Sequence, residues 1–165
     1  MKPLSVQKMN FIAFLVCFAL LLFALYLEIH MKLEPCPLCI LQRVLIMLLG
    51  VLFLIGALLD FQYTSRRVYY FIIFLVAFLG VIIAARHVWL ELSPPVEAAA
   101  CGAGITYLFQ MLPMTEALKL VFLGTGECAK ISWRFLGLSI PAWTLLWFII
   151  FALFSFWQGF KKNDY

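Results

Sequence analysis

Four long apolar runs constrain this chain more than any other feature of its sequence. They lie at about residues 10–29, 39–59, 68–90 and 141–160, and each is close to the ~20 residues that a helix needs to cross a bilayer. The chain is 66% apolar and 12% charged, whereas a soluble domain is about half apolar and about a quarter charged. The sequence therefore predicts an all-α membrane protein, a four-transmembrane-helix bundle that forms one domain over residues 1–165.

The segments between the runs differ in length and composition. Residues 30–38 form a short connection with two prolines, and residues 60–68 form a polar turn. Residues 91–140 are predicted to be a long, mostly irregular loop because they hold several prolines and glycines, although residues 114–122 have the pattern of an amphipathic helix on the membrane surface. The first apolar run is longer than the core of a signal peptide, so we expect it to be retained as a span.

Lysine and arginine in the short flanks predict the orientation. Four spans put both termini and the turn over residues 60–68 on one side, where six basic residues lie close to the spans. The other side also carries six, but they are spread along far more chain and are accompanied by six acids. We therefore expect both termini in the cytoplasm. The net charge is only +4, and no basic run interleaved with aromatic residues suggests a nucleic-acid surface.

Four of the five cysteines fall on the predicted outer side, namely Cys36, Cys39, Cys101 and Cys128. Disulfides form and persist in oxidising compartments outside the cytoplasm. Four cysteines in two outer segments are therefore better explained by thiol chemistry than by scattered core positions. Cys17 lies in the middle of the first run and is interpreted as a small buried or lipid-facing hydrophobe.

Cys36 and Cys39 form a Cys-x-x-Cys pair at the start of the second run. Pro37 suits the first turn of a helix, and a helix N-terminus stabilises a thiolate, for which Cys39 is the better candidate. Redox chemistry is the favoured interpretation, and a structural disulfide and a metal site are the alternatives. No histidine follows Cys39, which excludes a c-type haem motif. A zinc site would need further ligands, and Cys101 and Cys128 lack the paired spacing of such a site.

Two side chains are expected near this pair. Arg43 follows Cys39 by four residues, which puts both on one face of a helix. Arg43 either extends to the lipid headgroups or supplies a fixed positive charge for a thiolate or for the oxygen of a reduced acceptor. His87 ends the third run at a similar depth, and it is either an interfacial side chain or a group that moves a proton or hydrogen-bonds an acceptor carbonyl. His30 is interpreted as interfacial.

Cys101 and Cys128 form a second candidate pair. The chain between them is long enough for the sulfurs to meet, and closing such a loop contributes about 3.5 kcal/mol in the chain-entropy model. Gly102 and Gly126 leave the sulfurs little crowded, which suits attack by an external thiolate. An exchangeable disulfide and a staple for a loop without its own core are both open interpretations.

Longer motifs carry a resemblance to a known family. They are Pro35-Cys36-Pro37-Leu38-Cys39-Ile40-Leu41-Gln42-Arg43, Arg86-His87, and Gly124-Thr125-Gly126-Glu127-Cys128-Ala129 followed by Trp133-Arg134-Phe135-Leu136-Gly137-Leu138-Ser139-Ile140-Pro141-Ala142-Trp143. In these motifs, and over nearly the whole chain, the sequence resembles the bacterial disulfide bond formation protein B (DsbB) family, the membrane oxidases of the periplasmic thiol oxidant DsbA. The resemblance implies a thiol:quinone oxidoreductase of the bacterial inner membrane, with segments 30–38 and 91–140 in the periplasm.

The resemblance also implies a role for each cysteine pair. Cys101 and Cys128 would form the disulfide that reduced DsbA attacks, with Cys101 in the mixed disulfide. Electrons would then pass by thiol–disulfide exchange to Cys36 and Cys39. Cys39 would pass them to a bound ubiquinone or menaquinone.

A quinone site follows from the same resemblance. Arg43 matches the quinone-site arginine of the family, and His87 matches a histidine near the quinone. No metal cofactor is expected, and Gln42 and Arg86 receive no role. The competing hypothesis is a non-catalytic four-helix membrane protein with two structural disulfides. A thiol oxidoreductase of the vitamin K epoxide reductase type is disfavoured, because that family has its Cys-x-x-Cys late in the chain.

Overall fold

The computed structural model of the chain describes residues 6–31, 36–59, 63–92, 134–135 and 137–161. These residues form the helices α1 (Val6–Met31), α2 (Pro37–Leu58), α3 (Tyr63–Leu92) and α6 (Ile140–Phe160) and the strands β1 (Arg134–Phe135) and β2 (Leu138–Ser139). All four helices are long and apolar enough to cross a membrane. The predicted all-α, four-helix membrane fold is confirmed.

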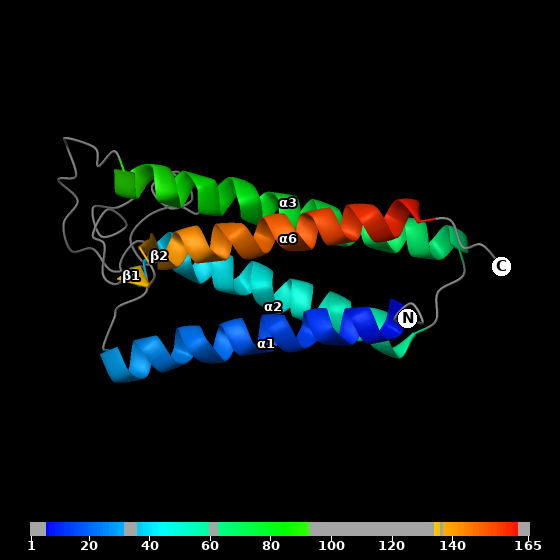
Figure 1. Cartoon of the computed structure of the whole chain (residues 1–165), viewed down its shortest axis with the longest axis horizontal. Coiled ribbons are helices and arrows are strands. Elements are labelled where there is room, and N and C mark those ends of the chain that lie inside the picture. Colours follow the sequence, from blue (N-terminus) through cyan, green and yellow to red (C-terminus); the bar gives the residue numbers. More distant parts are fainter. Residues whose placement is uncertain (1–5, 32–35, 60–62, 93–133, 136, 162–165) are drawn as a thin grey trace, which may run out of the picture.

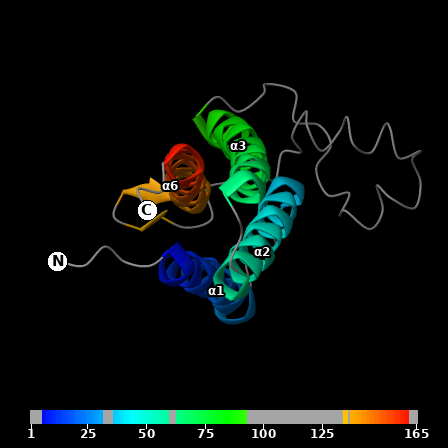
Figure 2. The same ribbon diagram turned by 90° about the vertical axis from the view of Figure 1, so that its right-hand side faces the viewer.

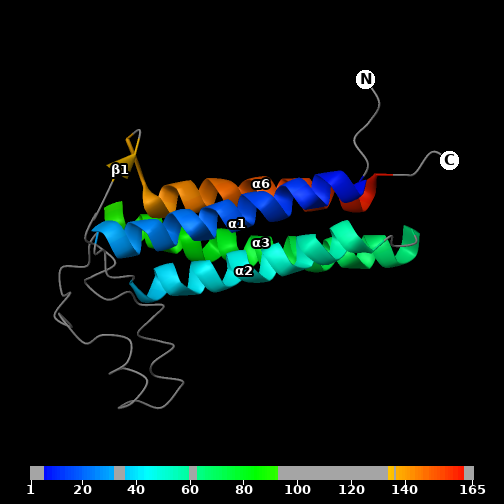
Figure 3. The ribbon, with the colours of Figure 1, turned by 90° about the horizontal axis from the view of Figure 1, so that it is seen from below.

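The helices run side by side along one bundle (Figures 1 and 3). α1 packs mainly on α2 and α3 on α6, and α2 also contacts α3 (Figure 2). The contact between α3 and α6 is close at Gly80, where a Cβ atom would lie 2.3 Å from Cδ1 of the buried Phe148 ring. The start of α1 and the end of α6 lie at one end of the bundle, which we call the termini end. The start of α2 lies at the other, which we call the cysteine end.

The helices extend past several of the predicted span boundaries. α3 begins at Tyr63, so the prediction of a polar turn over residues 60–68 is wrong from residue 63 onward. Arg66 is buried and donates through Nη2 to the backbone oxygen of Lys161 at 2.7 Å. Arg67 lies over an aromatic ring of α6 at 5.3 Å. Because both basic side chains have partners on α6, their charge does not end the helix.

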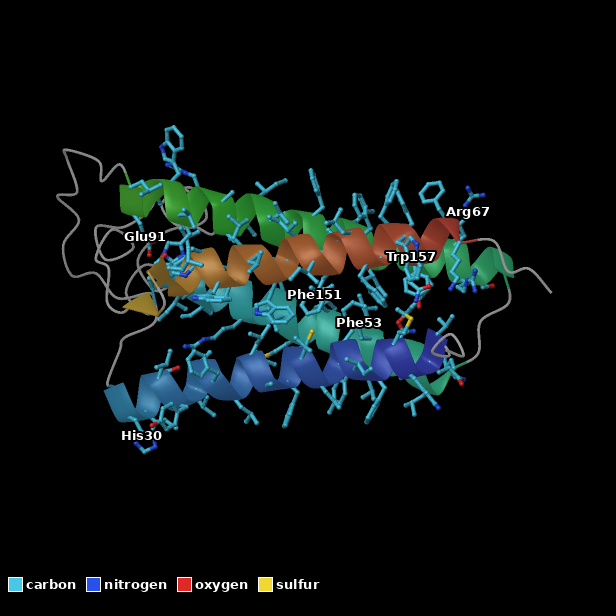
Figure 4. All side chains as sticks on the ribbon, in the orientation of Figure 1. His30, Phe53, Arg67, Glu91, Phe151 and Trp157 are labelled. Carbon is cyan, nitrogen blue, oxygen red and sulfur yellow. The ribbon has the colours of Figure 1, made fainter. Side chains whose placement is uncertain are left out.

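The surface and the core of the bundle are both apolar, as expected in lipid. Phe18, Leu75 and Leu153 are exposed on the outside of three helices. In the core, the labelled rings of Phe53 and Phe151 lie between the helices with their centroids 5.4 Å apart (Figure 4). Lipid contact therefore explains exposed apolar side chains that would be unfavourable in water.

A hairpin of two short strands precedes α6, within the segment that is predicted to be mostly irregular. Arg134 pairs with Ser139 and Phe135 with Leu138 in antiparallel register. Gly137 has φ +82° in the turn, a conformation that glycine adopts without strain. The predicted surface helix over residues 114–122 lies outside the described residues, as do Cys101 and Cys128.

Hydrogen bonds join three helices near the termini end. Asn10 of α1 donates through Nδ2 to the backbone oxygen of Gly56 of α2 at 2.9 Å, and accepts at Oδ1 from the hydroxyl of Tyr70 of α3 at 2.9 Å. The hydroxyl of Tyr69 donates to the backbone oxygen of Leu52. Asn10 and Tyr70 are both buried. This termini-end cluster therefore fixes how α1, α2 and α3 sit against one another.

Candidate functional site

Cys36 and Cys39 lie together at the N-terminus of α2. Cys36 is the N-cap residue, and its sulfur accepts a hydrogen bond from the backbone N–H of Cys39 at 3.2 Å. Pro37 occupies the first turn, where its missing N–H costs no hydrogen bond. The two Sγ atoms are 2.8 Å apart. Cys36 is buried and Cys39 half-buried, so Cys39 is the more accessible sulfur.

His87 of α3 lies against this pair. Its Nε2 atom is 3.6 Å from the sulfur of Cys36, and the side chain is only 2% exposed. The predicted common depth of His87 and the Cys-x-x-Cys pair is confirmed. The interpretation of His87 as an interfacial side chain is wrong, because the ring is enclosed by the bundle. His30, by contrast, is exposed at the end of α1, as expected (Figure 4).

Two residues that the sequence left without a role hold the far side of the imidazole. The Nε2 atom of Gln42 is 3.1 Å from Nδ1 of His87. Thr144 of α6 donates from its hydroxyl to Oε1 of Gln42 at 2.7 Å, and the same hydroxyl lies 2.9 Å from the backbone oxygen of Pro141. A connected set of side chains, Cys36, His87, Gln42 and Thr144, thus crosses α2, α3 and α6. We call it the cysteine-end network.

One arrangement of these hydrogen bonds places the hydrogen of the neutral imidazole on Nε2. Thr144 donates to Oε1 of Gln42, so the amide nitrogen of Gln42 faces Nδ1 of His87 and donates to it. With Nδ1 as the acceptor, the neutral ring carries its hydrogen on Nε2, which faces the sulfur of Cys36. In this arrangement His87 can donate a hydrogen bond from Nε2 to the sulfur of Cys36.

Arg43 has an ion-pair partner that the sequence reasoning missed. It pairs with Glu28 of α1, and its Nη2 atom is 3.4 Å from the backbone oxygen of Ala24. Arg43 therefore bridges α1 and α2 rather than only extending to lipid headgroups. The available signal was Glu28 itself, an acid at the apolar end of the first span. The side chains of both partners are partly exposed, at 25% and 35%.

Cys36, Cys39 and His87 also form a group of potential metal ligands. One ligand atom from each lies within 4.8 Å of the others. The spacing along the sequence presents only the cysteines as candidate ligands. His87 is 51 residues from Cys36, so no spacing rule along the chain could have joined them. Cys17 lies outside this group and is fully buried among apolar side chains. This is the buried one of its two expected positions, and the lipid-facing one is wrong.

Comparisons with known proteins match almost the entire chain. A family model described as "Disulfide bond formation protein DsbB" matches residues 7–158. The chain belongs to the DsbB family. The matched region includes both cysteine pairs, namely Cys36 with Cys39 and Cys101 with Cys128. The second pair lies outside the described residues.

Individual relatives in the DsbB family cover the chain to a similar extent. Disulfide bond formation protein B of Nitrosococcus oceani is 43% identical over 155 residues, which cover 94% of this chain and 92% of the relative. The protein of the same name from Xanthomonas axonopodis is 43% identical over 158 residues, with 95% and 92% covered. That of Xylella fastidiosa is 45% identical over 151 residues, with 91% and 87% covered.

Membership of the DsbB family agrees with the arrangement at the cysteine end. This chain is a multi-pass membrane protein of disulfide bond formation, with a Cys-x-x-Cys pair at a helix start. Residues 93–133, which include Cys101 and Cys128, connect the end of α3 to β1. Both attachment points lie at the cysteine end (Figure 1), and there the hydroxyl of Ser139 donates to Glu91 at 2.5 Å.

Proposed function

We propose that this DsbB-family protein is a disulfide oxidase of the bacterial inner membrane. It reoxidises a periplasmic DsbA-like thiol oxidant at Cys101 and Cys128, receives the electrons at Cys36 and Cys39, and passes them to ubiquinone or menaquinone in the membrane. The observation that carries the proposal is the dithiol at the start of α2, with two sulfurs 2.8 Å apart and an imidazole against one of them.

The first half of the reaction is thiol–disulfide exchange. A thiolate of the reduced partner attacks the sulfur of Cys101, the Cys101–Cys128 bond breaks, and Cys128 leaves as a thiolate. The second thiolate of the partner then attacks the mixed disulfide and releases Cys101. The partner ends oxidised, and Cys101 and Cys128 carry its two electrons as thiols. By the same exchange they reduce a disulfide between Cys36 and Cys39.

The second half returns Cys36 and Cys39 to the disulfide. A bound quinone would accept two electrons and two protons. Cys36 forms the new S–S bond with Cys39, and Nε2 of His87 lies 3.6 Å from the sulfur of Cys36. Both electrons leave through Cys39, because it is the more accessible of the two sulfurs. The two thiols lose their protons as the bond forms, so electrons and protons balance.

Arg43 is proposed to hold the acceptor beside Cys39. It lies one helical turn after Cys39, and its positive charge would stabilise an acceptor oxygen as that oxygen gains electron density. The ion pair with Glu28 and the contact with the oxygen of Ala24 support this role, because they hold a long side chain in one position. A partly exposed cation beside a partly exposed thiol suits a ligand that enters from the bilayer.

The orientation is also proposed from charge. The side with both termini carries six Lys and Arg against two acids, and the side with the cysteine pairs carries six against six. In the described part of the chain, Lys8, Arg66, Arg67 and Lys161 lie at the termini end. The positive-inside rule then puts the termini in the cytoplasm and the cysteine end in the periplasm.

One assay tests the proposed function. The purified protein in detergent is mixed with a reduced DsbA-like oxidant and a soluble quinone, and quinone absorbance is followed. We expect steady quinone reduction by the natural protein and by Cys17→Ala, whose thiol is buried away from the site, and none by Cys39→Ala. No turnover by the natural protein, or normal turnover by Cys39→Ala, would contradict the proposal.

A further inference from the structure

We propose that the reduced pair Cys36 and Cys39, together with His87, is a binding site for a thiophilic divalent ion of the Zn²⁺ and Cd²⁺ class. Two thiolate sulfurs and one imidazole nitrogen are the ligand types that zinc prefers, and two cysteines with one histidine form a known three-ligand set. The three ligand atoms already lie within 4.8 Å of one another on two helices. The site exists only in the dithiol form, because a disulfide offers no thiolate.

The distances fit tetrahedral coordination with one small movement. With metal–sulfur bonds of about 2.3 Å and metal–nitrogen bonds of about 2.0–2.1 Å, a sulfur and a nitrogen ligand lie about 3.6 Å apart, and two sulfurs about 3.8 Å. Cys36 Sγ and His87 Nε2 are already 3.6 Å apart. The two sulfurs are 2.8 Å apart and must separate by about 1 Å. Rotation of the half-buried Cys39 side chain supplies that movement, while the buried Cys36 and His87 stay in place.

The residues behind His87 can adapt to an ion. An ion on Nε2 requires the imidazole hydrogen on Nδ1, so Gln42 must present its oxygen there instead of its nitrogen. A flip of the Gln42 amide achieves this. Thr144 then accepts from the amide nitrogen and donates to the backbone oxygen of Pro141, which already lies 2.9 Å from its hydroxyl. Every polar group in the cysteine-end network keeps a partner in both states.

Charge and access also favour an ion here. Two thiolates carry two negative charges, which the ion and the positive N-terminus of α2 offset. Binding releases the two thiol protons and involves no electron transfer. The fourth position falls to water on the accessible side of Cys39. An ion held this way prevents Cys36 and Cys39 from forming a disulfide and so keeps the pair reduced. This effect on turnover rests on the proposed electron transfer, whereas ion binding itself does not. The ion is then an inhibitor of the reduced state and not a resident cofactor.

Cadmium binding gives a direct test, because a sulfur-to-cadmium charge-transfer band reports thiolate coordination. The full chain with Cys101→Ser and Cys128→Ser is reduced with a phosphine and titrated with Cd²⁺. We expect one ion per chain, displacement by Zn²⁺, and no band after oxidation or in Cys36→Ser. Residues that hydrogen-bond a metal-binding histidine usually contribute about tenfold or more to metal affinity, so Gln42→Leu should lower the Cd²⁺ affinity by at least that factor. His87→Ala removes a ligand and should lower it by at least as much.

His30→Ala is the matched control, because His30 is the other histidine of the chain and is exposed at the same end. It should bind Cd²⁺ as tightly as the unmodified background. No band in the reduced protein, or equal affinity in His87→Ala, would overturn the inference. Variants are compared only where circular dichroism gives the natural helix content, and Thr144→Val gives a second measure of the support behind His87. Cd²⁺ binding without quinone turnover would contradict the proposed function and leave the metal site intact.

Discussion

The two ends of the bundle both hold buried polar side chains that join three helices, but they are built from different groups. At the termini end, Tyr70 bonds Asn10, and both Asn10 and Tyr69 bond backbone oxygens of α2. At the cysteine end, side chains mainly bond other side chains: Cys36 contacts His87, and His87 contacts Gln42. The sulfur of Cys36 also accepts from the backbone N–H of Cys39. Backbone oxygens only accept, whereas thiols and imidazoles change their protonation, their charge or their covalent bonding.

This difference separates stability from chemistry. The hydrogen bonds of Asn10, Tyr69 and Tyr70 have one preferred arrangement, because two of them end on backbone oxygens that can only accept. A single arrangement suits a fixed contact between helices. The cysteine-end network has at least two, because the amide of Gln42 can donate to or accept from the imidazole. We therefore expect substitutions at the termini end to change unfolding and substitutions at the cysteine end to change turnover.

The largest expected effect on turnover is that of Cys36→Ser. The hydroxyl can cap α2 as the thiol does but cannot form a disulfide, so quinone reduction should be abolished while the thermal unfolding midpoint stays close to that of the natural protein. The measurements are quinone absorbance and a thermal unfolding scan in the same detergent. A large loss of stability would mean that Cys36, like Asn10, mainly stabilises the packing of the helices.

Arg43→Ala should have the next largest effect. Loss of a charged hydrogen-bond donor costs about 1.5–3 kcal/mol, so the apparent KM for quinone should rise about 10- to 100-fold. Exchange with the DsbA-like partner should be unchanged in a single-turnover mixture without quinone. Glu28→Gln is the matched variant, because it keeps Arg43 and removes its ion pair. Unchanged quinone kinetics in Arg43→Ala would limit Arg43 to a structural bridge.

Thr144→Val should have a smaller effect. It removes the hydroxyl that orients Gln42, and one hydrogen bond contributes about 0.5–1.5 kcal/mol, so turnover should fall about two- to tenfold. Thr144→Ser keeps the hydroxyl and should restore the rate. Equal rates for Thr144→Val and Thr144→Ser would show that the orientation of His87 does not depend on α6.

Asn10→Ala should have the smallest effect on turnover. It leaves the hydroxyl of Tyr70 and the backbone oxygen of Gly56 without their partner, which costs about 1–2 kcal/mol of stability within a membrane bundle. Turnover per folded molecule should be unchanged. Gln7→Ala, on the exposed side of the same helix, is the control and should change neither quantity. A selective loss of turnover in Asn10→Ala would remove the distinction between the two ends.

The sequence predicts the spans well because each apolar run has to match the thickness of the bilayer. Helix ends are predicted less well, since composition marks only the apolar part of a helix. α3 continues through Arg66 and Arg67, where the bundle supplies partners that the sequence does not show. The shared depth of His87 and the Cys-x-x-Cys pair could be predicted because consecutive spans are antiparallel. The third span therefore ends at the end of the bundle where the second span begins.

The partners within the site could not be predicted from local spacing. Gln42 meets His87 across 45 residues and Thr144 across 102, and a polar residue in an apolar run gives no indication of which helix it faces. The same reason hid the pairing of Glu28 with Arg43 and the third ligand atom beside Cys36 and Cys39. Those contacts depend on how the helices rotate about their axes, which packing decides.

The most direct measurement for the central claim is the redox state of Cys36 and Cys39 during one turnover. The oxidised protein, freed of quinone, is mixed with the reduced DsbA-like oxidant, quenched in acid and alkylated, and the two cysteines are examined by mass spectrometry. We predict that both are alkylated in samples quenched before quinone is added and that both are unlabelled in samples quenched after it. A pair that stays unlabelled before quinone, or stays labelled after it, would contradict the account.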